Sequence, residues 1–325
     1  MSKFKLPSPK TTAFVAALGV IVGIKKYDNY RSEQVRNQLK EAASVKAKEP
    51  LGPFEMPTKV IVYLSPPPGD GIHKSRIYFR DYVKPIFDAG ALDYDIYEAH
   101  QTGDIHATVC TELVNRRRDL IPSPKDDPLT SEQPLDAPAA ASQVQKVDPA
   151  TCPKIAIGRN TLVEIYNGLS EGATASLNPP PPPPPTDFLA TPSPSDPLSA
   201  SASPSPSPAV PAVDYDSLDT GVLPPIPPIG FVNFKNRIGW SSIPSRILRF
   251  FYDTPQVEKI GQQALNIVLE RRRVFQPSDL ELGTDDDRVH ALTPEQQIPL
   301  IVEPRILTDL VVYDLPKPPP GTENL

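Results

Sequence analysis

A short strand that leads through a Pro/Gly-rich turn into a helix-like segment constrains this chain more than any other feature. Residues 59–87 read KVIVYLSPPPGDGIHKSRIYFRDYVKPIF, with an apolar run at 60–64 and apolar residues at helical spacing from Phe79 to Phe87. A strand that enters a helix through a tight turn opens an α/β unit, and such turns often bind a phosphate or a nucleotide. This turn contains neither G-x-G-x-x-G nor G-x-x-x-x-G-K-[ST]. The sequence therefore predicts a nucleotide-binding type of fold without its phosphate chemistry.

Two further strand-helix pairs follow the first. Residues 94–99 and 154–157 are short β-rich runs, and helical segments at 105–118 and 161–169 come after them. Asp104 is expected to be the N-cap residue of the first of these helices. The expected fold class is α/β, with a mostly parallel sheet and flanking helices, Rossmann-like or lipid-kinase-like but without the motifs of either.

A second part of the α/β domain is expected to begin at Ile229. Thr254 and Pro255 suit the N-cap and the first position of a helix that runs to Arg273. A β-like segment at 298–302 and an apolar stretch at 306–313 follow it. These segments are expected to complete the sheet.

Proline separates the two parts of the domain. The chain has 325 residues and 44 prolines, and residues 177–228 contain a run from Pro179 to Pro185 followed by Ser/Pro alternation. Such a composition buries too little apolar surface to offset the entropy of ordering, so we expect a disordered insert. A polyproline run can also dock into SH3-type grooves, although a solvated spacer is the commoner role. Residues 119–153 are expected to form a surface loop.

The N-terminal 27 residues are basic and free of acids, and they contain an apolar run from Ala13 to Ile24. Three interpretations compete: the core of a signal peptide, a buried helix, and a short membrane anchor. No small-residue cleavage site follows closely, and lysines flank the run on both sides, which favours an anchor whose lysines snorkel. Gly19 and Gly23 have the G-x-x-x-G spacing that lets two membrane helices approach closely. The basic N-terminus also suits a mitochondrial address, and the charges do not decide the orientation.

The sequence contains no complete catalytic or metal-binding set. His106 and Cys110 share a helix face, but C-x-x-C and H-E-x-x-H are both absent, so neither a metal nor a cofactor is expected. Cys110 and Cys152 could form one disulfide or none. Asp70 stands in a Gly-Asp-Gly turn, where backbone conformation alone explains an aspartate. A formal net charge of −6 argues against nucleic acid as a partner.

Two arginine clusters and one aromatic segment are the candidates for interaction. Residues 116–118 and 271–273 each read RRR at the end of a predicted helix, where they complement the helix dipole or, alternatively, face anionic lipid. The segment 231–251 interleaves arginines with aromatic residues, a composition typical of interfaces and also of cores. Its partner-contact candidates are Arg237, Trp240, Arg246, Arg249, Phe250 and Phe251.

Several blocks taken together resemble one known family. A short anchor is followed by a strand with PPPGDG, by FRDYVKPIFDAGALDYDIYEA, by IAIGRNTLVEIYNGLSEG, and by PPIPPIGF with IPSRILRFF. In this order the blocks are similar to the fungal Tim-fifty-four family of mitochondrial inner-membrane translocase subunits. The resemblance implies a single-pass inner-membrane protein with its N-terminus in the matrix and its bulk in the intermembrane space. It also implies a non-catalytic subunit of the carrier translocase, and residues after Arg273 match the family poorly.

The resemblance also implies the partners and the role. The partners are the carrier translocase channel subunit, other membrane subunits, the small Tim chaperones and inner-membrane lipids. The role is scaffolding and docking for the insertion of multispanning carrier proteins into the inner membrane. Two rival interpretations are a membrane-anchored lipid or nucleotide kinase-like enzyme and a generic membrane adaptor. Lipid kinases of this type rely on a Gly-Gly-Asp-Gly loop, whereas the chain reads Gly158-Arg159-Asn160-Thr161 at the analogous place.

The expected organisation has seven segments. They are a matrix-facing N-terminus (1–10), a transmembrane anchor (11–27), a stalk or linker (28–57), the first part of the α/β domain (58–176), the disordered insert (177–228), the second part of the domain (229–315) and a tail (316–325).

Overall fold

A six-stranded sheet forms the centre of the molecule. The computed structural model describes residues 9–50, 52, 57–121, 151–178, 221, 223–236, 239–284, 300 and 302–316. Within them the strand order is β2-β1-β3-β4-β6-β5, and only β5 is antiparallel to its neighbour. The strands are β1 (Lys59–Leu64), β2 (Asp93–Glu98), β3 (Lys154–Ile157), β4 (Ile229–Val232), β5 (Arg272–Val274) and β6 (Val311–Tyr313). The predicted α/β class with a mostly parallel sheet is confirmed.

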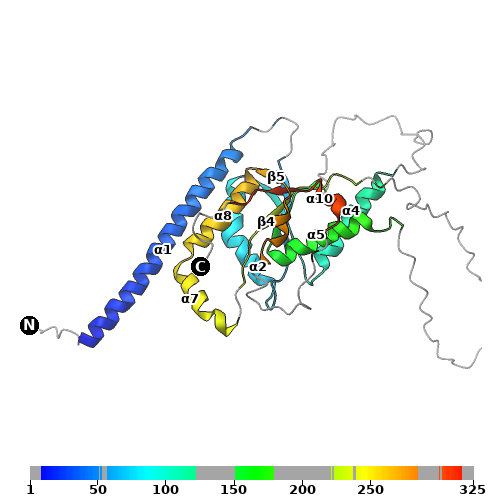
Figure 1. The fold of residues 1–325 in the computed structure, drawn as a ribbon. Coiled ribbons are helices and arrows are strands. Elements are labelled where there is room, and N and C mark those ends of the chain that lie inside the picture. The colour runs from blue at the N-terminus through cyan, green and yellow to red at the C-terminus, as the bar shows by residue number, and fades with distance from the viewer. Residues whose placement is uncertain are drawn as a thin grey trace, which may run out of the picture.

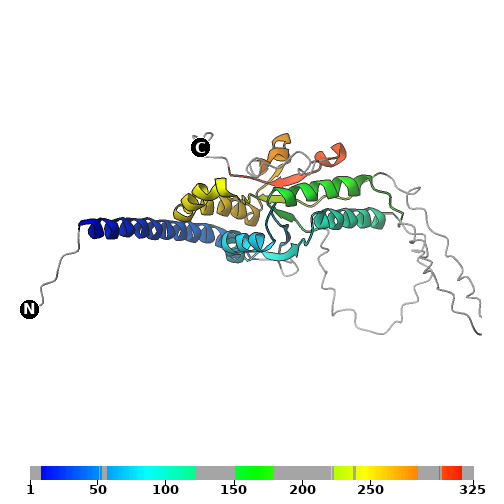
Figure 2. The same cartoon turned by 90° about the horizontal axis from the view of Figure 1, so that it is seen from below.

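Helices cover both faces of this sheet (Figures 1 and 2). One face is covered by α1 (Pro9–Ala47), α2 (His73–Tyr78), η1 (Phe79–Val83), α3 (Lys84–Ala89) and α8 (Thr254–Val268), and the other by α4 (Asp104–Asp119), α5 (Arg159–Thr174) and α10 (Pro304–Leu307). Alternate residues of β1 enter the two cores: Val62 and Leu64 belong to the first, and Ile61 and Tyr63 to the second. A central parallel strand is buried on both faces in this way, which explains its nearly continuous apolar sequence.

The helix that follows the Pro/Gly turn has a widened turn in its middle. Helices α2 and α3 are joined without a break by η1, a π-helical turn that ends two residues before Pro85. Proline has no N–H to donate, and its ring pushes away the carbonyl four residues earlier, so a wider turn relieves the crowding. The helix still buries Phe79, Val83 and Phe87, as its spacing predicts.

Helix α1 is one long helix with two different halves. Its second half packs on α8 and α3 and buries Leu39 and Ala43 in the first core. Its first half projects beyond the body of the molecule (Figures 1 and 2), and its apolar side chains there, among them Phe14 and Val20, are exposed. In the described part of the chain no helix reaches the length and apolarity that crossing a membrane requires.

The second half of α1 differs from the solvated stalk that the sequence predicts for 28–57. Only a few apolar residues occur there, but Leu39 and Ala43 lie one turn apart and meet a complementary site on α8. Gly261 on α8 makes this possible, because a Cβ there would lie 2.3 Å from Leu39 Cδ1. The prediction failed because only two core residues in this stretch give too weak a periodic signal.

Several predicted helix ends differ from the observed ones by one to five residues. Gly103 is the N-cap residue of α4, while the Asp104 carboxylate accepts hydrogen bonds from the backbone amides of His100 and Gln101. Asp253, not Thr254, is the N-cap residue of α8. Helix α8 ends at Val268, so residues 271–273 lie beyond the helix, with Arg272 and Arg273 in β5, and they do not complement a helix dipole.

The remaining predictions concern the loop, the insert and the C-terminal segments of the α/β domain. Leu177 and Ile226, expected at the ends of a disordered insert, are buried, while residues 179–220 lie outside the described residues. The β-like segment 298–302 lies largely outside them too, and the apolar stretch 306–313 divides into α10 and β6. The surface loop expected at 119–153 is described only at its two ends, 119–121 and 151–153.

Candidate functional site

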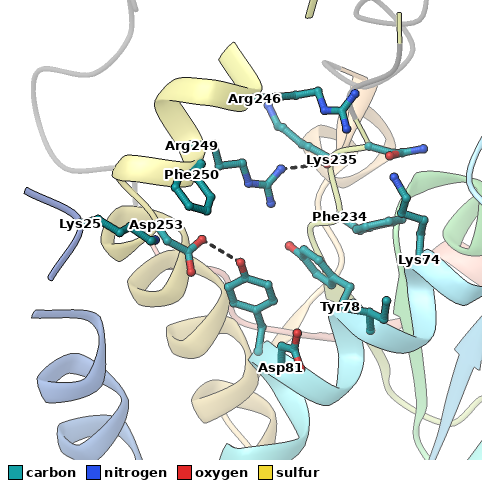
Figure 3. Close-up of a pocket in the computed structure, with 13 residues that line it drawn as sticks. Lys25, Lys74, Tyr78, Asp81, Phe234, Lys235, Arg246, Arg249, Phe250 and Asp253 are labelled. Carbon is teal, nitrogen blue, oxygen red and sulfur yellow. Dashed lines mark hydrogen bonds between the residues drawn. The ribbon is translucent and has the colours of Figure 1, made fainter. Parts of the chain in front are cut away.

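A cavity lies where α1, α2 and the chain after β4 meet α7 (Ile243–Phe251) (Figure 3). Its volume is about 430 Å³. It opens beyond the carboxyl ends of β1 and β4, the edge at which parallel α/β sheets usually bind their ligands. Position alone makes it the best candidate site in the described part of the chain.

The lining of the cavity is strongly basic. Five cationic side chains line it, against two carboxylates, Asp81 and Asp253. The cations are Lys25, Lys74, Lys235, Arg246 and Arg249. Both carboxylates have partners of their own: Asp81 accepts a hydrogen bond from Arg80 Nε at 2.8 Å, and Asp253 accepts one from Tyr82 Oη at 2.7 Å. The cavity is therefore suited to an anionic group rather than to a cation.

Hydrogen bonds hold the cationic side of the cavity in place. Arg249 Nη1 donates to the backbone carbonyl of Lys235 at 3.2 Å, which ties α7 to the chain after β4 (Figure 3). Lys25 Nζ lies 4.7 Å from the centre of the Phe250 ring, a cation–π contact between α1 and α7. Lys74 pairs with Asp70 at 3.0 Å. Asp70 is thus part of a surface ion pair at the turn, in line with the structural role expected for it.

Asp28 joins α1 to the corner between α7 and α8. Its carboxylate accepts hydrogen bonds from the backbone amide of Asp253 at 2.9 Å and from Thr254 Oγ1 at 2.8 Å. Burial of this carboxyl acts to raise its pKa, but the hydrogen bonds from Asp253 and Thr254 outweigh burial and leave the pKa below its ordinary value. A buried and ionised Asp28 therefore fixes the end of the projecting half of α1 against the cavity.

Three of the six partner-contact candidates line the cavity. Arg246, Arg249 and Phe250 line the cavity, and Phe251 is partly buried on the same helix. Trp240, in the 3₁₀ turn η3 (Trp240–Ser242), is 90% exposed. Arg237 lies outside the described residues. The sequence missed Asp28, Lys74 and Lys235, because single charged residues on unconnected segments carry no signal until the fold brings them together.

The chain has two G-x-x-x-G pairs, Gly19 with Gly23 on α1 and Gly168 with Gly172 on α5, and their surroundings differ. A Cβ at Gly19 or Gly23 would meet no atom within 4 Å in the described residues. A Cβ at Gly168 on α5 would lie 2.7 Å from the His106 carbonyl oxygen, and one at Gly172 would lie 3.0 Å from Leu113 Cβ, both on α4. The pair on α5 is thus used for close packing inside the domain, whereas the pair on α1 is open.

On the opposite face of the sheet, His106 and Arg117 have structural partners. His106 pairs with Glu171 at 2.8 Å, and no group of three metal-ligating side chains occurs in the described residues. Cys110 and Cys152 form no disulfide. Arg117 is buried and donates to the carbonyls of Gly172 and Ala175, so it satisfies the C-terminus of the neighbouring helix α5.

The place where a nucleotide would bind is filled. At the carboxyl ends of β1 and β3, Ser65 Oγ and Thr161 Oγ1 lie 2.7 Å apart, and Ser75 Oγ donates to the Ser65 carbonyl at 2.7 Å. All three side chains are buried. A phosphate-binding turn instead leaves backbone amides open toward the ligand.

Comparison with known proteins decides the family. A model of the family described as inner membrane protein import complex subunit Tim54 matches residues 1–209 of the chain. The chain belongs to the Tim54 family. The match includes every described element from α1 to α5, with strands β1 to β3, so the family resemblance expected from the sequence is confirmed. The family is described as a subunit of the inner membrane protein import complex, and its named members are mitochondrial inner membrane translocase subunits.

Three relatives from fungi are named mitochondrial import inner membrane translocase subunit Tim54. The relative from Yarrowia lipolytica is 36% identical over 123 residues, which is 38% of this chain and 22% of the relative. The relative from Aspergillus oryzae is 32% identical over 187 residues, 57% of this chain and 42% of the relative. The relative from Schizosaccharomyces pombe is 28% identical over 290 residues, 83% of this chain and 79% of the relative. The chain thus spans less than half the length of the first two relatives.

Proposed function

We propose that this chain is a non-catalytic scaffolding subunit of the inner-membrane carrier translocase, which docks components for the insertion of multispanning carrier proteins. The observation that carries the proposal is the match of residues 1–209 to a family described as a subunit of the inner membrane protein import complex. The α/β domain supplies a rigid body, and the long helix α1 holds this body close to the membrane.

The first half of α1 is the membrane anchor in this proposal. Its apolar side chains are exposed in a helix that stands clear of the body, and lysines follow directly at Lys25 and Lys26. The apolar run is short, so the bilayer thins around it or the flanking lysines snorkel toward the headgroups. Because the second half of the same helix is packed into the domain, the domain and the N-terminus lie on opposite sides of the membrane. The N-terminus faces the matrix, and the domain faces the intermembrane space.

Gly19 and Gly23 form the contact face for other membrane subunits, including the channel subunit. A helix that approaches this face finds no side chain in the way, because both glycines are open in the described residues. The small Tim chaperones, which deliver the substrates, dock on the domain in the intermembrane space. Inner-membrane lipids surround α1.

The kinase alternative lacks a site. The turn after β1 offers one carboxylate, Asp70, which is paired with Lys74, and buried hydroxyls fill the position of the phosphate-binding turn. Saturable ATP binding by the full-length chain in detergent, lost in Asp70→Ala, would revive the enzyme hypothesis. The polyproline adaptor alternative is tested by deletion of 179–185, which should leave partner binding unchanged.

Depletion of the chain from mitochondria tests the scaffold proposal. We expect insertion of multispanning carriers into the inner membrane to fall, while import of a soluble matrix precursor continues. Asp70→Ala should restore carrier insertion as fully as the unchanged chain does, because the turn has no catalytic role. Normal carrier insertion after depletion would contradict the proposal, and failure of Asp70→Ala alone would point to chemistry at the turn.

A further inference from the structure

Helix α7 presents its apolar side to the outside of the molecule. Ile243, Ile247 and Leu248 are exposed, while Arg249 is partly buried and lines the cavity. An amphipathic helix of a soluble protein normally does the reverse and buries its apolar stripe in the core. None of the nine residues of α7 is buried. The orientation therefore calls for an apolar medium or partner outside the domain.

The position of α7 identifies that medium. Phe250 makes a cation–π contact with Lys25, and the backbone amide of Asp253, two residues after α7, donates a hydrogen bond to the Asp28 carboxylate. These are the first residues of α1 after its apolar run, which ends at Ile24. Lysines and tyrosines at the end of a membrane helix lie at the level of the lipid headgroups, and Tyr27 and Tyr30 are both exposed there. Helix α7 thus lies at the same height as the headgroups.

The direction of α7 suits the plane of a membrane. Figure 1 shows α7 running across the direction of α1 rather than along it, at the end of the body from which the first half of α1 projects. A helix that lies across a membrane-spanning helix at headgroup level runs parallel to the membrane surface. Its apolar side chains then face the same apolar layer that α1 enters.

Charge and aromatic content agree with this placement. Trp240 precedes α7 and Tyr252 follows it, and both are exposed. Arg246 and Arg249 share the cavity beside α7 with Lys25, Lys74 and Lys235. Interfacial helices combine an apolar face, aromatic residues near the headgroups and cations that attract anionic lipids.

We propose that residues 240–252 form an interfacial helix that lies in the anionic surface of the bilayer into which α1 inserts, with phospholipid headgroups at the basic cavity. The inference rests on the membrane anchor of the proposed function. It assigns the aromatic and arginine-rich segment to lipid, where the sequence alone suggested a protein partner.

Trp240 is the only tryptophan of the chain, so intrinsic fluorescence reports the position of this segment without labelling. The full-length chain is reconstituted into phosphatidylcholine vesicles that contain phosphatidylglycerol, with and without a nitroxide quencher on the lipid near the headgroup. We expect a blue-shifted Trp240 emission, strong quenching by the lipid-borne nitroxide and protection from acrylamide in the water phase. Emission as in water, with acrylamide quenching and no lipid quenching, would overturn the proposal, and this is also the result expected if α7 binds a protein.

A pair of matched variants separates binding from misfolding. Ile247→Glu with Leu248→Glu adds two negative charges to the apolar face and should abolish quenching by the lipid-borne nitroxide. Lys259→Glu makes the same change in net charge at an exposed position of α8 and should leave the quenching intact. Circular dichroism checks that both variants fold. Equal quenching in the double variant and in the unchanged chain would overturn the assignment of this face to lipid.

Resistance to alkaline carbonate extraction distinguishes the two proposals. If the reconstituted chain is extracted by carbonate, the anchor itself is wrong and the proposed topology fails. If the chain resists extraction but Trp240 stays in water, the anchor stands and only the interfacial helix is wrong.

Discussion

The carboxylate of Asp28 accepts a hydrogen bond of 2.9 Å from the backbone amide of Asp253, which lies 225 residues further along the chain. This contact joins the end of the proposed membrane anchor to the corner between α7 and α8. Asp253 also accepts a hydrogen bond from Tyr82 on η1. The projecting half of α1 is thus coupled to the domain through a continuous helix and through a buried polar contact.

Removal of the Asp28 carboxylate should loosen this corner. Asp28→Ala leaves the amides of Asp253 and Thr254 without their partner, which we expect to cost about 1–3 kcal/mol in the free energy of unfolding. Denaturant titration of the full-length chain in detergent measures this cost. Glu33→Ala, on an exposed stretch of the same helix, is the control and should change stability little. If Asp28→Ala and the unchanged chain have the same free energy of unfolding, the contact is not formed.

The same contact predicts a pH dependence with a defined sign. The pKa of Asp28 in the folded protein lies below its ordinary value, because the hydrogen bonds from Asp253 and Thr254 outweigh the effect of burial. Its stabilisation is fully present above the ordinary carboxyl pKa of about 4 and is lost as the pH falls through the lower folded-state value. Comparison of the unchanged chain with Asp28→Asn between neutral pH and pH 3 tests this. The stability difference between the two should shrink on acidification, and a constant difference would contradict the assignment.

The packing of α4 on α5 should tolerate no side chain at Gly168. A Cβ there would lie 2.7 Å from the backbone carbonyl oxygen of His106, so Gly168→Ala forces the two helices apart. We expect a loss of about 1–3 kcal/mol, the usual cost of overpacking. Gly19→Ala is the matched control, since that position is open and alanine favours helix. Thermal unfolding measures the stability of both variants. If Gly168→Ala is as stable as Gly19→Ala, α4 and α5 are not in close contact at this position.

Glu112 should be needed to neutralise a buried lysine. Lys154, at the start of β3, is 2% exposed, pairs with Glu112 and donates to Tyr63 Oη at 3.0 Å. Glu112→Gln leaves this charge buried without a counter-charge, which we expect to cost about 3 kcal/mol. A double variant with Lys154→Met should recover most of the loss. Chemical denaturation measures both, and no recovery in the double variant would show that the ion pair does not explain the cost.

The second half of α1 should behave as part of the core. Leu39→Ala removes a side chain that is 8% exposed, with an expected cost of about 3 kcal/mol. Val45→Ala, on the same helix but 59% exposed, should cost much less. The comparison can be made by denaturant titration. If the two variants are equally stable, α1 is the solvated stalk that the sequence suggested. A chain that lacks residues 1–50 would then fold normally.

The open face of Gly19 and Gly23 should be needed for assembly and not for folding. Replacement of both by leucine blocks the close approach of another membrane helix, while no described atom of the chain itself is displaced. We expect less of the complex on native gels and unchanged protease resistance of the domain. An unchanged complex would rule out this packing role.

The sequence predicted the local elements of the fold well, and for a physical reason. The apolar runs of β1 and β3 and the helical spacing of Phe79, Val83 and Phe87 are short-range patterns that burial on a sheet imposes directly. The contacts between distant segments were not predictable in this way. Leu39 meets Gly261, and Arg117 meets the end of α5, through shape and geometry that only the assembled fold defines.

Three residues that line the cavity were partner-contact candidates of the sequence, and their role in binding stays a prediction. Arg246, Arg249 and Phe250 were expected from the mixture of arginine and aromatic residues. Lys25, Lys74 and Lys235 could not be, because each is an ordinary surface lysine in its own segment. The outward orientation of α7 was also hidden, since periodicity gives the existence of an apolar face but not its direction.

Mass spectrometry of what co-purifies with the tagged chain from gently solubilised mitochondria tests the central claim most directly. The scaffold account predicts recovery of the carrier translocase channel subunit and the small Tim chaperones in near-stoichiometric amounts. Recovery of the chain alone, as a free membrane monomer, would contradict it.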